Sequence, residues 1–494
     1  MKNNEVILTG YGKVKGYVED GVSYYKGIPF AAPPVGDLRW KPPQPPASWK
    51  GTRDCTSFIA TAPQCIKVPP AILGPIPENE DCLYLNVSLP ANRTSDKLPV
   101  MVWLHGASYT GAHGNIDPCP LLVKKGIVLV GVNMRLGILG LLAHPLLDKE
   151  SPHGVSGNYM FLDMIAALEW IQKNISAFGG DPDNVTIFGN SGGGCKVSVL
   201  MATPLAKGLF HRAIIQSGAA VEGFELAGIT AKEMEKRGKK LFSILGVDKE
   251  ADPLKAARAL PWDKIAYAGG ANAGGVEDAT VEGWFLPDLP DKIFKTGKQN
   301  ITPVITFADM AEFVVPGTHL FFPTLQRGYI NIMTSAAKAG SKGYAAILEH
   351  VPCKWKAEGV IACHAMELPY IFGDMNPKSI NWVVAGYVAK ATNPNHKAPV
   401  APAIDEKMSQ EDMAKARAEF VKQNDPGLNE VDRQLSDDMM TMWVQFARTG
   451  NPSVKGLIRW PAYNETTDKY LALDEPLKVK SGFSKIKPLQ RSDT

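Results

Sequence analysis

The chain has 494 residues, of which 45% are hydrophobic and 21% charged, and its formal net charge is +3, so its composition is that of an ordinary soluble globular protein. This charge gives no reason to expect nucleic acid as a partner, no window approaches the roughly eighteen apolar residues of a membrane span, and seven cysteines are too few for a disulfide scaffold. Residues 1–5 lack the apolar core of a signal peptide, so we expect a cytoplasmic protein with mostly reduced cysteines, secreted only if its N-terminus has been trimmed.

The predicted elements change character along the chain. Residues 5–50 carry short alternating segments and a turn-rich run at 27–36, a pattern that predicts strands followed by an irregular loop. Residues 100–104 and 127–132 are continuous apolar runs, typical of strands buried on both faces of a parallel sheet. Residues 161–174 predict a helix with a broad apolar face. This alternation favours an open α/β sheet, in which sites gather at the carboxyl ends of the strands.

Residues 189–194 read Gly-Asn-Ser-Gly-Gly-Gly, between an apolar run at 185–188 and a helix-compatible stretch at 195–201. A serine flanked by glycines at a strand-to-helix junction is typical of the nucleophile elbow of a serine hydrolase, because the tight turn tolerates only minimal side chains and leaves the hydroxyl exposed. Short Gly/Ser patterns also arise by chance in a chain with 46 glycines. The flanking strand and helix supply the required context, so we predict that Ser191 is the nucleophile.

A serine nucleophile needs an imidazole to remove its proton and a carboxylate to orient the imidazole. In α/β-hydrolases the chain order is serine, acid, histidine, so the base should follow Ser191. The candidates are His211, His319, His350, His364 and His396. His211 lies too close to the elbow helix to reach back easily. His364 follows a strand-like run at 359–362 and is the favoured position, while His319 and His350 remain as alternatives.

Several collinear stretches resemble the type-B carboxylesterase family, the cholinesterase-like branch of the α/β-hydrolases; they are residues 27–40, 80–87, 133–137, 178–182, the elbow, 208–218 and 443–452. The resemblance spans most of the chain. It implies an α/β fold of the α/β-hydrolase type, in which a central, mostly parallel twisted sheet carries helices on both faces and cap or gorge insertions. The whole chain, residues 1–494, would be a single domain with variable substrate-gorge regions near 220–300 and 374–435.

The same resemblance implies a serine carboxylesterase that hydrolyses small-molecule carboxylic esters through an acyl-enzyme intermediate. It implies neither a metal nor an organic cofactor, and we expect a monomer or a weak homo-oligomer. A serine hydrolase acting on an amide or carbamate bond, and a non-catalytic cholinesterase-like binding protein, remain as alternatives.

The family's sequence motif around the catalytic histidine is similar to residues 363–373, which implies His364 as the base. The family's motif around the acid is similar to residues 303–313 and implies Glu312, with Asp309 as the rival, although the flanking residues are much altered. Glu312 as a merely exposed loop carboxylate also remains open. Only 52 residues separate Glu312 from His364, about half the spacing in relatives.

The oxyanion hole needs backbone N–H groups from the residue after the nucleophile and from a glycine-rich loop. Gly192 supplies the first, and the resemblance assigns Ala107 and Ser108, in the loop 105–109, as the others. Alanine and serine resist positive φ more than glycine does, so the conformation of this loop is the least certain part of the site.

The resemblance also implies buried ion pairs, Arg39 with Glu80 and Arg135 with Asp163, and a hydrogen bond from Ser217 near the triad. A Cys65 to Cys82 bridge is conceivable, but we expect these thiols to be reduced. Asn190 replaces the usual glutamate beside the nucleophile, which weakens the case for a cationic, choline-like substrate.

Overall fold

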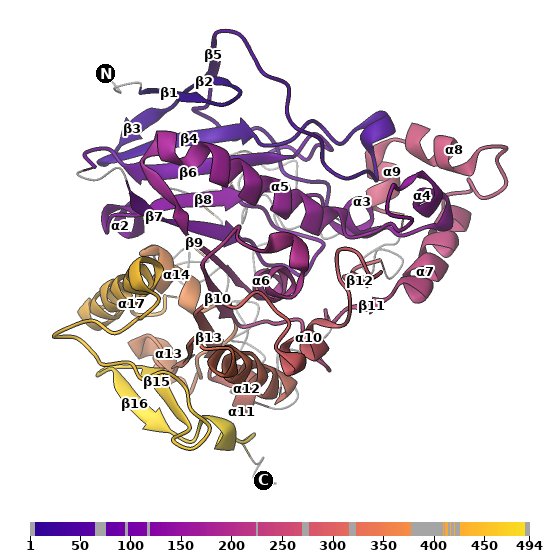
Figure 1. Cartoon of the computed structure of the whole chain (residues 1–494). Coiled ribbons are helices and arrows are strands. Elements are labelled where there is room, and N and C mark those ends of the chain that lie inside the picture. Colours follow the sequence, from indigo (N-terminus) through magenta and orange to yellow (C-terminus); the bar gives the residue numbers. More distant parts are fainter. Residues whose placement is uncertain are drawn as a thin grey trace.

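The computed structural model describes residues 5–64, 76–93, 97–115, 119–223, 226–268, 276–315, 323–376 and 425–489, together with positions 409, 411, 412, 415 and 419. Its centre is one sheet of eleven strands in the order β16-β15-β14-β13-β10-β9-β7-β8-β6-β4-β3. The N-terminal strands lie at one edge of this sheet and the C-terminal strands at the other, with helices packed on both faces (Figure 1). The predicted α/β-hydrolase architecture is therefore confirmed.

The first residues form the short strands that the alternating pattern predicted. Two of them and a later strand make a small separate sheet: β1 (Val6–Thr9), β2 (Gly12–Lys15) and β5 (Thr52–Asp54). Three others form an antiparallel edge of the large sheet: β3 (Tyr17–Glu19), β4 (Val22–Pro29) and β6 (Tyr84–Pro90). The predicted irregular loop follows β4 and contains a single turn of 3₁₀ helix, η1 (Gly36–Leu38).

The interior of the large sheet is parallel. Its strands are β7 (Leu98–Leu104), β8 (Val128–Val132), β9 (Gly180–Asn190), β10 (Arg212–Gln216), β13 (Val304–Asp309), β14 (Gly343–Leu348) and β15 (Lys469–Leu473). Antiparallel β16 (Lys478–Ser481) closes the far edge. Every residue of β8, β13 and β14 is buried. Burial on both faces explains why β8 reads as an unbroken apolar run rather than as an alternating pattern.

Each face of the sheet has its own hydrophobic core. One core packs against α5 (Tyr159–Asn174), α6 (Gly192–Ala202), α10 (Pro290–Thr296) and α12 (Pro323–Lys338). The other packs against α2 (Pro120–Lys124), α13 (Cys353–Ala357), α14 (Glu367–Phe372) and α17 (Glu430–Thr449). The predicted helix at 161–174 is α5, which begins two residues earlier than expected.

The remaining described helices and two short strands lie in the segments that connect these elements. They are α3 (Gly137–Leu141), α4 (Pro145–Glu150), η2 (Ile175–Phe178), η3 (Pro204–Ala206), β11 (Ile229–Thr230), α7 (Ala231–Ile244), α8 (Pro253–Ala259), α9 (Trp262–Ala266), β12 (Thr280–Val281), α11 (Ala311–Val314) and η5 (Phe483–Lys485). The expected variable region near 220–300 holds several of them, whereas most of the region near 374–435 lies outside the described residues.

Two buried ion pairs fix the loops around this sheet, as the resemblance implied. Arg39 meets Glu80 at 2.5 Å and also donates to the carbonyl oxygens of residues 257, 258 and 260 at the end of α8. Arg135 meets Asp163 of α5 at 2.6 Å. Cys82 is a free, buried thiol, while Cys65 lies outside the described residues.

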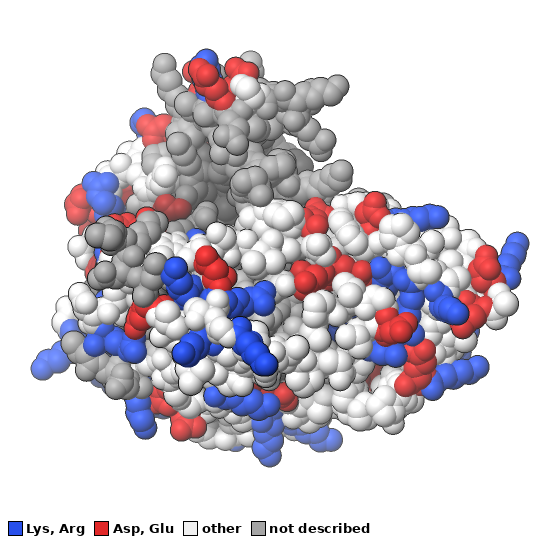
Figure 2. Space-filling view, turned by 90° about the horizontal axis from the view of Figure 1, so that it is seen from above, with Lys and Arg blue, Asp and Glu red and all other residues white. Residues whose placement is uncertain are grey.

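The described surface carries both signs of charge. Figure 2 shows acidic and basic side chains interspersed over the face that it presents. None of the helices in the described ranges is both long enough and apolar enough to cross a bilayer.

Candidate active site

Ser191 stands in the turn between β9 and α6, with φ 59° and ψ −126°. Its backbone N–H donates to the carbonyl of Gln216 at 2.8 Å. The neighbouring positions have no room for side chains, because a Cβ on Gly189 or Gly193 would lie 2.5 or 2.1 Å from the carbonyl oxygen of Leu104. Ser191 is partly exposed while all of α6 is buried. The turn therefore presents one hydroxyl at the carboxyl edge of the sheet, as the elbow motif predicted.

The strand register brings the other candidate residues to the same edge. Asn190 pairs with Gln216 across β9 and β10, and Gln216 pairs with Phe307 across β10 and β13. β13 ends at Asp309, and the short helix α11 follows with Glu312 in its first turn. Because neighbouring parallel strands end together, the elbow and the carboxylates after β13 share one end of the sheet.

Glu312 and His364 are in direct contact. Glu312 Oε1 lies 2.5 Å from His364 Nδ1, and the two residues are only 1% and 5% exposed. The second oxygen of Glu312 accepts the N–H of Asp309 at 3.1 Å. Burial disfavours the charged imidazolium, but the hydrogen bond and the charge of Glu312 outweigh it and raise the pKa of His364 above its ordinary 6.5. The reading of Glu312 as an exposed loop carboxylate is therefore wrong.

The segment before His364 is not a strand, contrary to the sequence expectation. Residues 359–362 form an irregular connection between α13 and α14, which is held by a hydrogen bond from the N–H of Ala311 to the carbonyl of Ala362. The position beside β14 is occupied by β15, which comes from more than a hundred residues later in the chain. Because β15 already pairs with β14, residues 359–362 do not join the sheet and form a connection before His364 instead.

A second carboxyl, that of Asp309, supports the loop that carries His364. Asp309 Oδ2 accepts the N–H of Ala365 at 3.0 Å and the hydroxyl of Ser217 at 3.2 Å. Burial, followed by the charges of Glu367 and Glu312, raises the pKa of Asp309 well above its ordinary value. The rival acid thus fixes the backbone next to His364, and Ser217 bonds to this rival rather than to Glu312.

Glu367 links the same loop to the nucleophile turn. Its Oε1 accepts the amide of Asn190 at 2.6 Å and the amide of Gln216 at 2.9 Å. Burial raises the pKa of Glu367 above its ordinary value. Because Asn190 immediately precedes Ser191, these two hydrogen bonds hold the turn containing His364 beside the elbow.

The loop after β7 packs directly on the elbow. A Cβ on Gly106 would lie 2.8 Å from the carbonyl oxygen of Asn190 and 3.3 Å from Ser191 Cβ, and a Cβ on Gly192 would lie 2.2 Å from the carbonyl oxygen of Ser108. Ala107 and Ser108 both adopt φ of 54°. The loop therefore takes up the left-handed conformation at both positions although neither residue is glycine.

Sequence reasoning missed Glu367 at this site, and it also missed Lys196. The side chain of Lys196 is fully buried, and its ammonium donates to carbonyl oxygens of the loop after β7. The available signal was a single lysine in a helix whose other residues are small or apolar.

The other histidine candidates lie elsewhere or cannot be placed. His211 Nδ1 accepts the N–H of Val185, and His350 Nε2 lies 2.9 Å from Asp432 of α17. His319 and His396 lie outside the described residues. Within the described ranges, no group of three or more histidine, cysteine, aspartate or glutamate side chains is arranged to hold a metal ion.

The fold and the strand–serine–helix turn define the chain as an α/β-hydrolase. A model of the carboxylesterase family matches residues 3–316 and 387–488, so the chain belongs to the carboxylesterase family and is a carboxylic-ester hydrolase. The matched segments include Ser191 and Glu312 but leave out His364, which stands in the interval where the spacing departs from that of relatives.

Individual relatives agree with this family. The chain is 33% identical to the para-nitrobenzyl esterase of Bacillus subtilis (strain 168), over 97% of this chain and 96% of the relative. It is 46% identical to the fumonisin B1 esterase of Sphingopyxis macrogoltabida, but over 49% of this chain and 44% of that protein. Among solved structures, a PNB esterase matches with a TM-score of 0.77 and 27% identity over 97% of both chains.

Proposed function

We propose that this carboxylesterase cleaves its substrate by a two-step acyl-enzyme route in which Ser191 is the nucleophile, His364 the general base and Glu312 its orienting acid. The observation that carries the proposal is the buried 2.5 Å contact between Glu312 and His364 Nδ1, on a loop that Glu367 ties to Asn190. With Nδ1 directed at Glu312, the opposite nitrogen Nε2 is left to take the Ser191 proton.

In the first step Ser191 Oγ bonds to the ester carbonyl carbon and its proton passes to His364. The tetrahedral oxyanion lies against the N–H groups of Gly192, Ala107 and Ser108. His364 then returns the proton to the alkoxide as the carbon–oxygen bond breaks, and the alcohol leaves. In the second step water repeats the attack, the acid leaves, and Ser191 regains its proton. His364 relays each proton, and the attacking water supplies the one that Ser191 regains, so the sequence requires no metal or organic cofactor.

For the substrate we propose a neutral or anionic small-molecule ester. Asn190 is uncharged, and its amide is engaged by Glu367, whose own charge burial disfavours. A quaternary ammonium group would therefore find little negative charge beside the nucleophile. Relatives named for para-nitrobenzyl, fumonisin B1 and fatty acyl-CoA substrates suggest a panel of aryl esters, bulky natural esters and thioesters as the first screen.

The test is hydrolysis of p-nitrophenyl acetate and butyrate by the wild-type protein and by Ser191→Ala. We expect turnover by the wild type only, and a mass increase of one acyl group on Ser191 when the reaction is quenched early. A fluorophosphonate should label the same serine once. Turnover by Ser191→Ala comparable to that of the wild type would overturn the proposal.

We further propose that residues 1–494 form one hydrolase domain that acts in a reducing compartment as a monomer or weak homo-oligomer. One continuous sheet joins strands from both ends of the chain, and no disulfide joins the six cysteines of the described ranges. Light scattering after size exclusion tests the oligomeric state. Thiol titration of the purified protein tests whether the cysteines are reduced.

A further inference from the structure

Lys196 is a fully buried lysine in the first half of α6, five residues after Ser191. Its Nζ donates to the carbonyl oxygens of His105 and Ser108, each at 2.9 Å, and reaches that of Gly106 at 3.5 Å. An ammonium carries three N–H donors, and here each has a backbone carbonyl of the same short loop within reach. No carboxylate of the described residues pairs with it.

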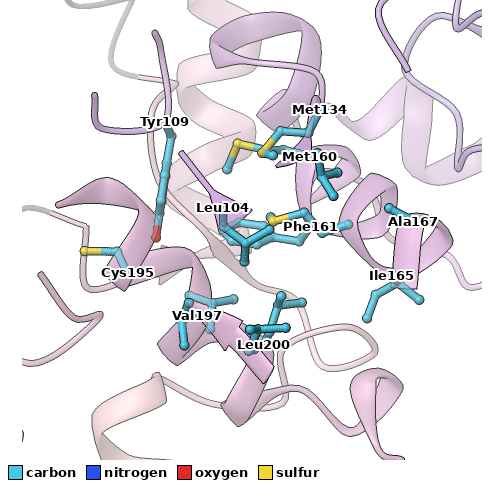
Figure 3. Packing of buried hydrophobic residues seen from close by; sticks show 14 of the residues in the cluster. Leu104, Tyr109, Met134, Met160, Phe161, Ile165, Ala167, Cys195, Val197 and Leu200 are labelled. Carbon is cyan, nitrogen blue, oxygen red and sulfur yellow. The ribbon is translucent and has the colours of Figure 1, made fainter. Parts of the chain in front are cut away.

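A buried ammonium without a carboxylate is unfavourable, since the charge leaves water and gains only neutral acceptors. The neighbouring side chains are buried aromatic rings. The centroid of the Tyr109 ring lies 5.5 Å from Lys196 Nζ, and the same ring makes an edge-to-face contact with Phe161 of α5 at 5.4 Å between centroids. Figure 3 shows Tyr109 beside Cys195, the residue before the lysine on α6. An apolar side chain would fill such a place more cheaply.

The loop that receives these hydrogen bonds is strained. Ala107 and Ser108 both have φ of 54°, and the left-handed conformation is unfavourable for a residue with a Cβ. Such a conformation persists only where the surroundings enforce it. The Lys196 ammonium donates to His105 before the strained pair and to Ser108 within it, so it is positioned to help enforce this conformation.

The direction of the hydrogen bonds also matters. In a planar trans peptide the C=O and the N–H of the next residue point in opposite directions. Drawing the Gly106 carbonyl toward the ammonium therefore turns the Ala107 N–H away from it. A positive charge on a peptide carbonyl also polarises that peptide group, which makes its N–H a stronger donor.

We propose that Lys196 is a positioning residue for the oxyanion hole: its ammonium clamps the carbonyls of His105, Gly106 and Ser108 so that the amides of the loop face the developing negative charge above Ser191. This inference rests on the proposed function, because the amides of Ala107 and Ser108 have the role assigned there. Lys196 itself touches no substrate and transfers no proton.

The clamp depends on charge, and its charge is poised to titrate. Burial lowers the pKa of Lys196 to about 7, while Cys195 on its own helix acts in the opposite direction. The titratable groups of the facing loop are Tyr109 and His105, the latter itself beside His113. Burial raises the pKa of Tyr109 well above 10.0 and lowers that of His105, so both stay neutral near pH 7. The clamp is therefore charged below about pH 7 and weakens above it. Its effect on activity is opposite to that of His364, which acts as a base only when it has lost its proton.

The experiment compares Lys196→Met, which keeps the length without donors, with Lys196→Gln, which keeps uncharged donors. We expect Lys196→Met to lower kcat on p-nitrophenyl butyrate about 10²-fold, the size of losing one oxyanion donor, with little change in KM. Affinity for an aryl trifluoromethyl ketone, which forms a tetrahedral oxyanion on the serine, should fall in parallel. Lys196→Gln should recover part of kcat, and neither variant should keep the alkaline limb of the wild-type pH profile.

Val199→Ala is the matched control, because it removes buried volume from the same helix and leaves the hydrogen bonds from Lys196 to the loop in place; we expect a lower Tm and an unchanged kcat. The clamp would be overturned if Lys196→Met kept the kcat and the ketone affinity of the wild type. It would also be overturned if Val199→Ala lost kcat to the same extent as Lys196→Met, because loss of stability would then explain both variants. If Lys196→Met does not fold, the wild type decides: ketone affinity that stays flat across pH 7 refutes the inference. An active Ser191→Ala would instead refute the proposed function, whereas an inactive Ser191→Ala beside a normal Lys196→Met refutes only the clamp.

Discussion

Glu312→Gln is the sharpest test of the site because the structure leaves a glutamine no satisfactory orientation. Glu312 accepts two hydrogen bonds, one from His364 Nδ1 at 2.5 Å and one from the backbone of Asp309 at 3.1 Å. A glutamine has one oxygen and one NH₂ group. If its oxygen stays on the Asp309 N–H, the NH₂ group faces Nδ1 and holds the wrong tautomer of His364. If it turns around, two donors collide at Asp309.

The magnitude follows from this geometry. A histidine held in the wrong tautomer carries its proton on Nε2 and cannot accept one from Ser191, and such a change in a serine–histidine–carboxylate triad lowers kcat about 10⁴-fold. That factor corresponds to about 5 kcal/mol of transition-state stabilisation. We expect a fall of about 10³- to 10⁴-fold in kcat and little change in KM, because Glu312 touches the base rather than the substrate.

Asp309→Asn is the matched control, since the two residues are three positions apart and both buried. Burial, followed by the charges of Glu367 and Glu312, raises the pKa of Asp309 well above its ordinary value, so an uncharged amide replaces this carboxyl at less cost than it would replace an ordinary carboxylate. Its oxygen can still accept the N–H of Ala365. We expect less than about a tenfold loss of kcat, or about 1.4 kcal/mol.

The assay is steady-state hydrolysis of p-nitrophenyl butyrate by both variants, with Tm and near-UV circular dichroism recorded to exclude unfolding. Near-normal kcat in Glu312→Gln, together with a large loss in Asp309→Asn, would refute the reasoning and transfer the role of the acid to Asp309. Equal small losses in both would show that neither carboxyl orients the base.

Three further predictions concern pH, the elbow and the fold. Activity should rise with pH through an apparent pKa above 6.5, because Glu312 raises the pKa of His364 and the base must be neutral; in Glu312→Gln this acid limb should move to lower pH in a kcat/KM profile. Gly193→Ala should abolish activity and lower Tm, since the new Cβ would lie 2.1 Å from a β7 carbonyl oxygen; a stable, active variant would contradict the assigned backbone contact. Arg135→Met should reduce the free energy of unfolding in urea by about 3–5 kcal/mol, because it leaves the carboxylate of Asp163 buried and unpaired; the double change with Asp163→Leu should recover much of that loss, and failure to do so would assign the cost to packing.

Local pattern sufficed for much of the fold and for the strand–serine–helix turn at residue 191. The unbroken apolar runs at 100–104 and 127–132 became buried parallel strands, because a strand covered on both faces needs an apolar residue at every position. The glycines around Ser191 stand where the elbow meets the carbonyl of Leu104 and admits no Cβ. In these places the sequence requirement and the structural cause lie within a few residues of each other.

Other features depended on contacts between distant parts of the chain. Residues 359–362 have the composition of a strand, yet β15 had already paired with β14, and no local signal reveals such competition. Whether Glu312 or Asp309 meets His364 is decided by the turn of α11, which directs one carboxylate to the imidazole and the other to the backbone of Ala365. By itself, the sequence determined the sheet, the strand–serine–helix turn and a small set of candidate histidines and carboxylates for Ser191. Tertiary structure alone decided which carboxylate joined the histidine and placed a lysine ammonium behind a strained loop, because hydrogen-bond geometry and burial are set by residues far apart in the chain.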